Sequence, residues 1–266
     1  MVKEFLAHHY WALILGGSNG LGLATARKLA SHGMNICVVH RDPRIEMDRI
    51  NSDFDTLRAV SGVQVLTMNA DALQAEKRQE IVTALQAAMG VEGKVRTLVH
   101  SIAKGNLKAM HTSEGPVLNN DDFRITLDSM AVSLYDWTQA LVQRQLFAAD
   151  ARVLSFTSEG STRAWAHYGA VAAAKAALEA ITRNMALEFA PLGLRANCIQ
   201  AGVTDTRSLQ AIPGSADLIT YTKQRNPFHR LTTPEDVANA VYLLCKDEAA
   251  WINGAVIPVN GGEHIS

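Results

Sequence analysis

A tyrosine and a lysine stand seven residues apart in a segment where they could do chemistry together. Tyr168 and Lys175 belong to an apolar, alanine-rich stretch with a helical pattern. Seven residues are two helical turns, so both side chains are expected on one face. A phenol placed there can donate a hydrogen bond, and then a proton, to an oxygen that becomes negative during a reaction. A nearby ammonium group would favour phenolate character in this tyrosine.

A glycine-rich turn predicts a nucleotide site. The segment Gly16-Gly17-Ser18-Asn19-Gly20-Leu21-Gly22 stands between an expected strand and an expected helix. Glycines allow a tight turn and a close approach to a pyrophosphate, which then rests on the helix N-terminus. The spacing GxxxGxG differs from the common GxGxxG fingerprint, and a glycine cluster can also be a plain tight turn. The position of this turn, between a strand and a helix, favours the nucleotide site.

The end of the second expected strand indicates which cofactor binds. An acidic residue usually stands there to bind the ribose hydroxyls of NAD, whereas this chain has His40 and Arg41, with Arg44 close by. A guanidinium pairs well with a 2′-phosphate, so NADPH is expected in preference to NADH, unless Arg41 is only a solvated surface residue. Asp71 could accept from the adenine amino group, or could cap a helix starting near Gln74.

Strand-like apolar runs alternate with helical patterns along the whole chain. The pattern predicts a doubly wound parallel seven-stranded sheet of the Rossmann type, in a single α/β domain over residues 1–266. The least regular stretch, 203–230, is expected to be a substrate-covering loop beyond the carboxyl ends of the strands. Strands are expected at 10–15, 35–39, 63–68, 95–100, 152–157, 195–200 and 255–259. Helices are expected near 21–32, 43–60, 74–89, 121–148, 168–190 and 234–246.

The composition excludes several classes of protein. Twenty-five Lys and Arg residues against 26 Asp and Glu residues leave a net charge of −1, which argues against a nucleic-acid or membrane-surface partner. The N-terminal segment lacks a signal-peptide pattern, and no apolar stretch is long enough to span a membrane. Three widely separated cysteines, Cys37, Cys198 and Cys245, predict reduced core thiols of a cytoplasmic protein. No histidine or cysteine spacing predicts a metal site.

These features resemble the short-chain dehydrogenase/reductase superfamily over essentially the whole chain. The resemblance rests on the glycine turn, on Ala201-Gly202 and on the ending Val259-Asn260-Gly261-Gly262. Most members carry Tyr-x-x-x-Lys, but Val171 stands four residues before Lys175, and Tyr168 gives Tyr-x6-Lys instead. That shifted tyrosine, together with the segment Val99-His100-Ser101-Ile102-Ala103, resembles the enoyl-acyl-carrier-protein reductase branch.

The resemblance implies roles for individual residues. Tyr168 would stabilise the oxygen of an enoyl thioester, Lys175 would hold the nicotinamide ribose, and Ser158 fills the position of the family's serine. Ser158 could bind substrate or water, or could be a turn residue. Thr206 could contact the cofactor or start a helix. The expected cofactor-binding residues are Gly16, Ser18, Asn19, Gly20, Leu21, Gly22, His40, Arg41, Asp71, Ala72, Ser101, Ile102, Ala103, Lys175, Gly202, Val203 and Thr206.

The leading expectation is NADPH-dependent reduction of an enoyl thioester carried on acyl carrier protein or coenzyme A, in fatty-acid or related acyl-chain biosynthesis. A carbonyl reductase or alcohol dehydrogenase of the same superfamily, using Tyr168, remains an alternative. A second alternative is a nucleotide-sensing protein without turnover. The family also implies a homotetramer, formed through the long helices near 121–148 and 168–190. Met130 stands near the position of an asparagine that keto-reducing relatives use, which counts against ketone reduction.

Overall fold

Seven parallel strands form the central sheet of the computed structural model, which describes residues 3–266. The strand order is β3-β2-β1-β4-β5-β6-β7, so the direction of winding reverses between β1 and β4. The predicted doubly wound parallel sheet is therefore confirmed. The strands are β1 (Tyr10–Leu15), β2 (Asn35–His40), β3 (Val65–Asn69), β4 (Lys94–His100), β5 (Phe147–Ser158), β6 (Leu194–Ala201) and β7 (Val256–Val259).

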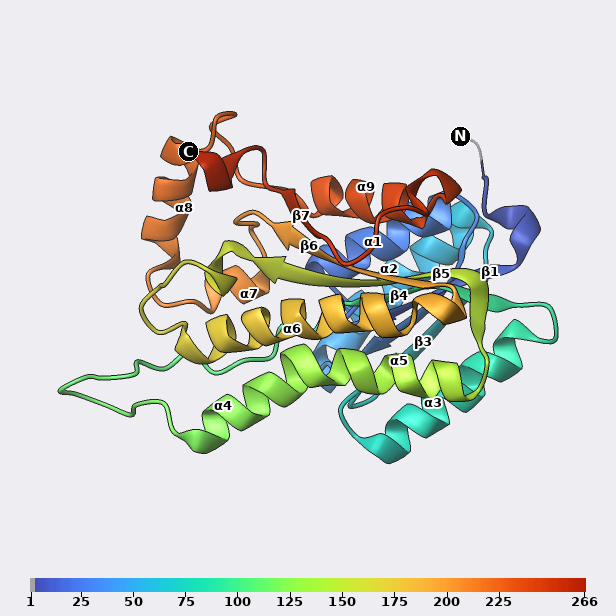
Figure 1. Ribbon diagram of the computed structural model, residues 1–266, viewed down its shortest axis with the longest axis horizontal. Helices are drawn as coiled ribbons and strands as arrows, with labels where there is room; N and C mark the ends of the chain where they lie inside the picture. Colours follow the sequence, from blue (N-terminus) through green and yellow to red (C-terminus); the bar gives the residue numbers. More distant parts are fainter. Residues whose placement is uncertain (1–2) are drawn as a thin grey trace.

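Helices cover both faces of the sheet, and Figure 1 shows α1 and α9 on one side with α4, α5 and α6 on the other. Alternate residues of β1 face opposite sides: Ala12 and Ile14 pack in one core cluster, Leu13 and Leu15 in the other. This explains why the strand is apolar throughout. The helices are α1 (Gly20–Ser31), α2 (Met47–Ser61), α3 (Ala75–Met89), α4 (Asn120–Leu127), α5 (Ser133–Gln143), α6 (Gly169–Glu188), α7 (Arg207–Gln210), α8 (Ser215–Arg225) and α9 (Pro234–Cys245).

The single helix expected over 121–148 was wrong in two respects. A π-helical turn at Asp128–Val132 separates α4 from α5. The helix then ends at Gln143, because Gln145 adopts a left-handed conformation (φ 56°). A glycine usually adopts this conformation just after the end of a helix. Because glutamine stands here instead, the sequence does not indicate where the helix ends. Residues from Phe147 onward belong to β5, which begins five residues earlier than predicted.

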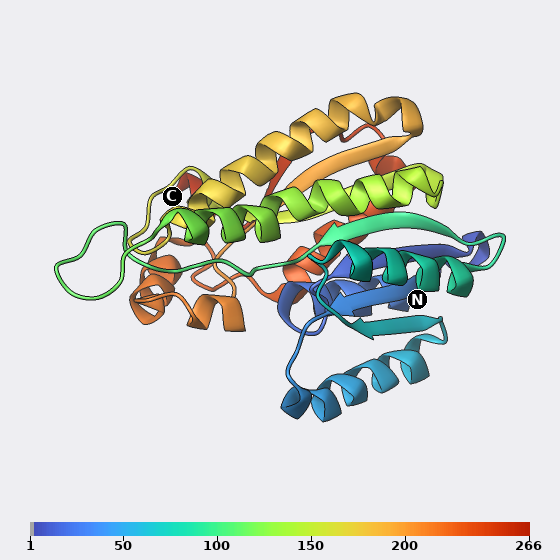
Figure 2. The same ribbon diagram turned by 90° about the horizontal axis from the view of Figure 1, so that it is seen from below.

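The stretch 203–230 is more regular than expected, because it contains α7 and α8. In both views these helices lie at one end of the molecule, together with the C-terminus and the long connection before α4 (Figures 1 and 2). The arrowheads of β5 and β6 point to this end in Figure 1. The helical stretch therefore does lie beyond the carboxyl ends of the strands, where open α/β sheets bind their ligands.

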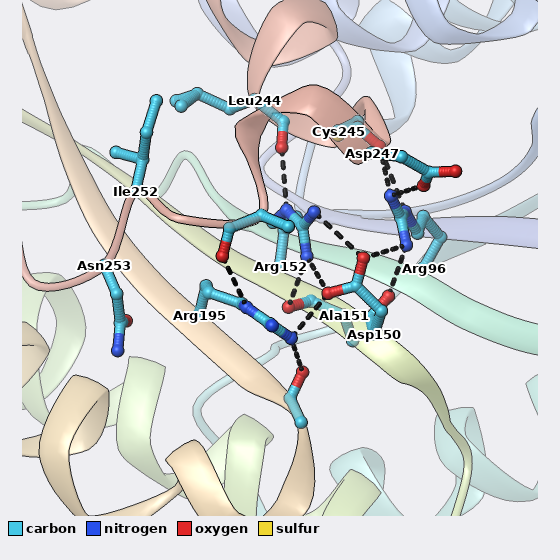
Figure 3. A network of polar contacts seen from close by, with 12 residues as sticks. Arg96, Asp150, Ala151, Arg152, Arg195, Leu244, Cys245, Asp247, Ile252 and Asn253 are labelled. Atoms are coloured by element: carbon cyan, nitrogen blue, oxygen red, sulfur yellow. Dashed lines mark hydrogen bonds and ion pairs between the residues drawn. The ribbon is translucent and has the colours of Figure 1, made fainter.

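The opposite end of the sheet is held by a network of charges around Asp150 (Figure 3). The buried guanidinium of Arg96 donates to the Asp150 carboxylate at 2.8 Å and to the carbonyl of Cys245 at 2.8 and 3.0 Å. Arg152 donates to the carbonyl of Leu244 at 2.8 Å. These carbonyls lie at the C-terminus of α9, where cations are favoured. The network therefore anchors α9 to the two strands β4 and β5.

The predicted start of α9 is confirmed, since Thr233 caps the helix by accepting from the Asp236 N–H at 3.2 Å, with Pro234 at the first helical position. The three cysteines are buried and free, as predicted. Within residues 3–266, no helix has the length and apolar character required to cross a membrane.

Candidate active site

The glycine turn forms a close-fitting corner between β1 and α1. Gly16 has a φ of +82°, and a Cβ added there would lie 2.6 Å from the carbonyl oxygen of Ser101 at the end of β4. A Cβ on Gly22 would lie 2.3 Å from the carbonyl oxygen of Gly16, so the first turn of α1 packs directly on the loop. Any side chain at either position would collide with backbone. The turn therefore presents bare backbone and a helix N-terminus to a ligand, which fits a dinucleotide pyrophosphate.

A cavity of about 860 Å³ begins at this turn and brings most of the predicted residues together. Its apolar part is formed around Met130, Val171 and Leu107. Its size suits a nicotinamide ring together with a substrate. The predicted site residues that line it are Gly16, Asn19, Gly20, Leu21, Ser101, Ile102, Ala103, Ser158, Tyr168, Lys175, Gly202, Val203 and Thr206.

Tyr168 stands at the N-cap of α6, one residue before the helix begins. The expectation that it lies within the helix was therefore wrong, although its carbonyl accepts the first helical hydrogen bond, from the Ala172 N–H at 2.7 Å. Burial raises the pKa of the Tyr168 phenol. The phenol is therefore a neutral hydrogen-bond donor at neutral pH, in contrast to the phenolate character that the sequence suggested.

Lys175 is buried on α6, and its ammonium group donates to the carbonyl of Phe156 at 2.6 Å. Burial lowers the pKa of this amine to about 8. The buried imidazole of His100 lies 2.7 Å from the Ser133 hydroxyl, and burial together with the charge of Lys175 lowers its pKa to about 3. His100 is thus a neutral core histidine. Lys175 is the charged group of this pair at neutral pH.

Ser158 and Gly160 adjoin the phenol of Tyr168. The hydroxyl oxygen of Ser158 is buried and has no hydrogen-bond partner among the described residues, so it is available to a substrate oxygen or a water. A Cβ on Gly160 would lie only 2.5 Å from Cε1 of the Tyr168 ring. Because Gly160 has no side chain, the ring can lie close to the backbone at this position. The sequence analysis missed this residue, because nothing in its spacing indicates a contact with a side chain eight residues later.

The residues expected at the adenosine end lie outside the cavity lining. His40 is buried, with Nδ1 2.9 Å from the carboxylate of Asp42. Arg41 is 61% exposed and donates to Asp71 at 2.8 Å. The alternative of Asp71 as cap of α3 was wrong, since Gln74 occupies that cap; the Asp71 side chain accepts from the Leu73 N–H instead. An exposed guanidinium beside this loop can turn to a cofactor phosphate.

Three other predicted residues have mainly structural contacts. Ser18 is buried in the glycine turn. The carbonyl of Ala72 accepts from the indole N–H of Trp137 at 2.9 Å, which ties the loop after β3 to α5. Thr206 caps α7, accepting from the Leu209 N–H at 3.3 Å, so it starts a helix and lines the cavity at once.

Glu159 joins the active-site segment to α8. Its carboxylate accepts from Arg225 at 2.6 Å and lies 3.5 Å from Arg163. No group of histidine, cysteine or acidic residues in the described part of the chain could hold a metal ion. A phenol, an ammonium group and a hydroxyl, those of Tyr168, Lys175 and Ser158, lie around one cavity.

The fold and this arrangement agree with the comparison against protein families. A family model described as "Enoyl-(Acyl carrier protein) reductase" matches residues 16–264. The chain belongs to this family, within the short-chain dehydrogenase/reductase superfamily, and it is an oxidoreductase that uses a nicotinamide dinucleotide.

Individual relatives carry different activities. The chain is 26% identical over 252 residues to the peroxisomal 2,4-dienoyl-CoA reductase of Mus musculus, covering 94% of this chain and 82% of the relative. It is 27% identical over 267 residues to the cyclohexanol dehydrogenase of a Rhodococcus strain, covering 94% of each. Its structure is similar to that of the enoyl-[acyl-carrier-protein] reductase (NADH) from Aquifex aeolicus VF5, with a TM-score of 0.82, 26% identity and 98% of each chain covered.

Proposed function

We propose that the protein reduces the carbon–carbon double bond of an enoyl thioester. The observation that carries this proposal is the position of Tyr168, whose phenol shares one cavity with Lys175 and the glycine turn, while Val171 fills the usual tyrosine position. In an enoyl thioester, two carbon atoms more than in a ketone separate the oxygen from the carbon that accepts hydride. A phenol three residues earlier in the chain, and so about one turn further from Lys175, suits that longer distance.

Tyr168, Lys175 and Ser158 have different roles in the proposed reaction. A bound nicotinamide cofactor would supply the hydride, and the protein provides orientation and electrostatics. Negative charge then develops on the thioester oxygen, to which the neutral phenol of Tyr168 donates a hydrogen bond and then a proton. Lys175, charged at neutral pH, would bind the ribose hydroxyls and stabilise that oxygen through space. The unpartnered hydroxyl of Ser158 gives a second donor.

The test compares crotonyl-CoA and crotonyl-acyl carrier protein with a panel of ketones and alcohols, following the absorbance of the reduced cofactor. Substrate-dependent oxidation with the enoyl thioesters is expected, and Tyr168→Phe should lower turnover by about a hundredfold or more while cofactor binding is nearly unchanged. Turnover of the carbonyl panel alone would favour the second candidate, a carbonyl reductase or alcohol dehydrogenase, which the Rhodococcus relative supports. Cofactor binding without turnover of either class would favour the nucleotide-sensing alternative.

We also propose NADPH as the cofactor, because Arg41 lies exposed at the end of β2 where a 2′-phosphate would need a cation. Arg41→Gln should raise the KM for NADPH and leave that for NADH unchanged. Asp71→Asn, which releases Arg41 from its ion pair, should lower the KM for NADPH. Equal KM values for the two cofactors in the wild-type protein and both variants would contradict this assignment.

A homotetramer is proposed from the same family. The helices α4 to α6 and the π-helical turn expose several large apolar side chains, which a partner subunit would cover: Ile125, Val132, Tyr135 and Leu187. Light scattering that shows a monomer at working concentration would contradict this.

A further inference from the structure

One wall of the active-site cavity is polar and aromatic, unlike the apolar surroundings of Met130 and Val171. It is built from two segments that are far apart in the chain, the connection after β5 and helix α8. The residues of this wall are Glu159, Arg163, Trp165, Tyr221 and Arg225. A cavity for a plain alkyl chain has no need of two guanidinium groups, so this wall calls for a ligand of a different chemistry.

Arg163 is oriented by two aromatic rings but keeps donors free. Its guanidinium carbon lies 6.0 Å from the centre of the Trp165 ring and 5.6 Å from that of Tyr221, and it donates to the Tyr221 hydroxyl at 2.9 Å. Its other polar contact among the described residues is the 3.5 Å ion pair with Glu159. A guanidinium has five N–H donors, and the side chain is 39% exposed. The group is therefore held in place and still able to bind an acceptor.

Arg225 provides the second, independent observation. Its side chain is only 8% exposed, and it donates to Glu159 at 2.6 Å. Its Nε is buried and has no hydrogen-bond partner among the described residues. Buried N–H groups of native proteins are nearly always paired, with protein, water or ligand. Arg225 therefore lines the cavity while one of its donors, Nε, lacks an acceptor among the described residues.

The charges around the wall favour an oxygen ligand. Glu159 is the carboxylate shared by both guanidinium groups. The carboxyl of Glu263 lies 3.6 Å from Arg225, but burial and the charge of Glu159 raise its pKa, and one of its oxygens accepts from the Val203 N–H at 3.3 Å. The two guanidinium groups thus share one carboxylate, Glu159, while the Glu263 carboxyl lies at 3.6 Å from Arg225, beyond hydrogen-bond distance.

We propose that this wall is a subsite for an oxygen acceptor, a carbonyl or carboxylate, on the acyl chain at the end remote from the reacting double bond. The inference rests on the proposed enoyl-thioester reduction and specifies its substrate class: acyl chains that carry oxygen, in preference to plain alkyl chains. Arg163 and the Nε of Arg225 are the donors.

The test compares pairs of 2-enoyl-CoA thioesters of equal tail length, one with an alkyl tail and one whose tail ends in a methyl ketone or carboxylate. At the tail length that reaches the wall, kcat/KM should be about tenfold or more higher for the oxygen-bearing member, as expected for a hydrogen bond to a charged group. Arg163→Gln should remove most of this ratio. Arg124→Gln, a matched change of an exposed arginine on α4, should leave it unchanged.

Binding is read separately from turnover through Trp165, which lies beside Arg163. Saturated oxygen-bearing acyl-CoA should change the intrinsic fluorescence of the protein, and Trp165→Phe or Arg163→Gln should abolish that change. Equal kcat/KM values at every tail length, with no fluorescence response, would overturn the subsite and assign a water to Arg225. If no enoyl thioester is turned over, the proposed function fails. The fluorescence titration still decides the subsite in that case, since binding that depends on Arg163 supports it and no binding overturns it.

Discussion

Replacing Gly160 by alanine would test whether the position of the Tyr168 ring determines the rate. The backbone of Gly160 lies outside the left-handed region, so alanine is compatible with its conformation. The added Cβ would instead lie 2.5 Å from Cε1 and 3.1 Å from Cδ1 of the tyrosine ring. The ring is the end of a side chain and can move, so the cost to stability is expected to be small.

The size of the effect follows from this contact. Carbon atoms in favourable contact are about 3.5–4.0 Å apart, so the ring has to move by about 1 Å or more. A misplacement of about 1 Å in a catalytic arrangement can lower the rate by about a hundredfold. We therefore expect Gly160→Ala to lower kcat by about a hundredfold, with an unchanged Kd for the cofactor and an unfolding temperature within a few degrees of the wild type.

The assay is cofactor oxidation with crotonyl-CoA, in a double-mutant cycle with Tyr168→Phe. Because the alanine acts through the phenol, adding Gly160→Ala to the Tyr168→Phe variant should change kcat by less than about threefold. A purely structural effect would lower both backgrounds equally. Wild-type kcat in Gly160→Ala would refute the reasoning, and so would a full hundredfold loss in the absence of the phenol.

Three further predictions concern charged groups. Burial lowers the pKa of Lys175 from 10.5 to about 8, so the unfolded chain binds this proton more tightly than the folded chain does. Lys175→Met should therefore have a higher unfolding temperature than the wild type at neutral pH. Calorimetry should show this difference in unfolding temperature shrinking as the pH rises from 8 to 10.5. Asp150→Asn should lower the free energy of unfolding in urea by about 3–5 kcal/mol, since it leaves the buried Arg152 without a carboxylate partner. Asp247→Asn, at the 87% exposed partner of Arg96, should cost about 1 kcal/mol or less. The arginines of the network lower the pKa of the folded-state Asp150 carboxyl below its usual 3.8, although burial opposes this. The contribution of Asp150 to the free energy of unfolding is therefore complete above pH 3.8 and is lost as the pH falls through the folded-state pKa. An acid-unfolding curve of the wild type identical to that of Asp150→Asn would contradict this. The Glu46–Arg207 ion pair, at 2.9 Å, joins α7 to the turn after β2. Glu46→Gln should therefore increase the rate of cofactor release, measured by stopped-flow, by up to about fivefold. High salt should increase the release rate of the wild type in the same way and leave that of the variant unchanged.

The strands were the most predictable part of the fold. Largely apolar runs located β1, β2, β4 and β6 within about one residue of their ends, because parallel strands in the middle of a sheet are buried on both faces. The start of β5 was missed, since the segment Phe147–Ala151 contains no β-branched residue and continues the helical spacing before it. The left-handed Gln145, in the place of a glycine, removed the usual signal for the end of the helix.

The site residues that the reaction requires by type could be predicted from the sequence. The residues that reach the site only through the packing of distant segments could not. The spacing of Tyr168 and Lys175 and the glycine turn indicated residues that do meet around one cavity. The polar wall was not predicted, because Glu159 and Arg225 are 66 residues apart and neither belongs to a recognisable motif. The contact between Gly160 and the tyrosine ring also depends on the fold of the connection after β5. Such contacts arise only from the folded arrangement of distant segments.

The charge network of Figure 3 also has a consequence for how the chain is made. Arg96 bonds to a carbonyl that lies 149 residues later, and Arg152 to one that lies 92 residues later. Both arginines therefore leave the ribosome long before the C-terminus of α9 exists to accept their hydrogen bonds. Until then, burying them at the base of β4 and β5 is unfavourable. The sheet is thus expected to close at this end only when synthesis is nearly complete, and a chain cut before α9 should stay hydrated there.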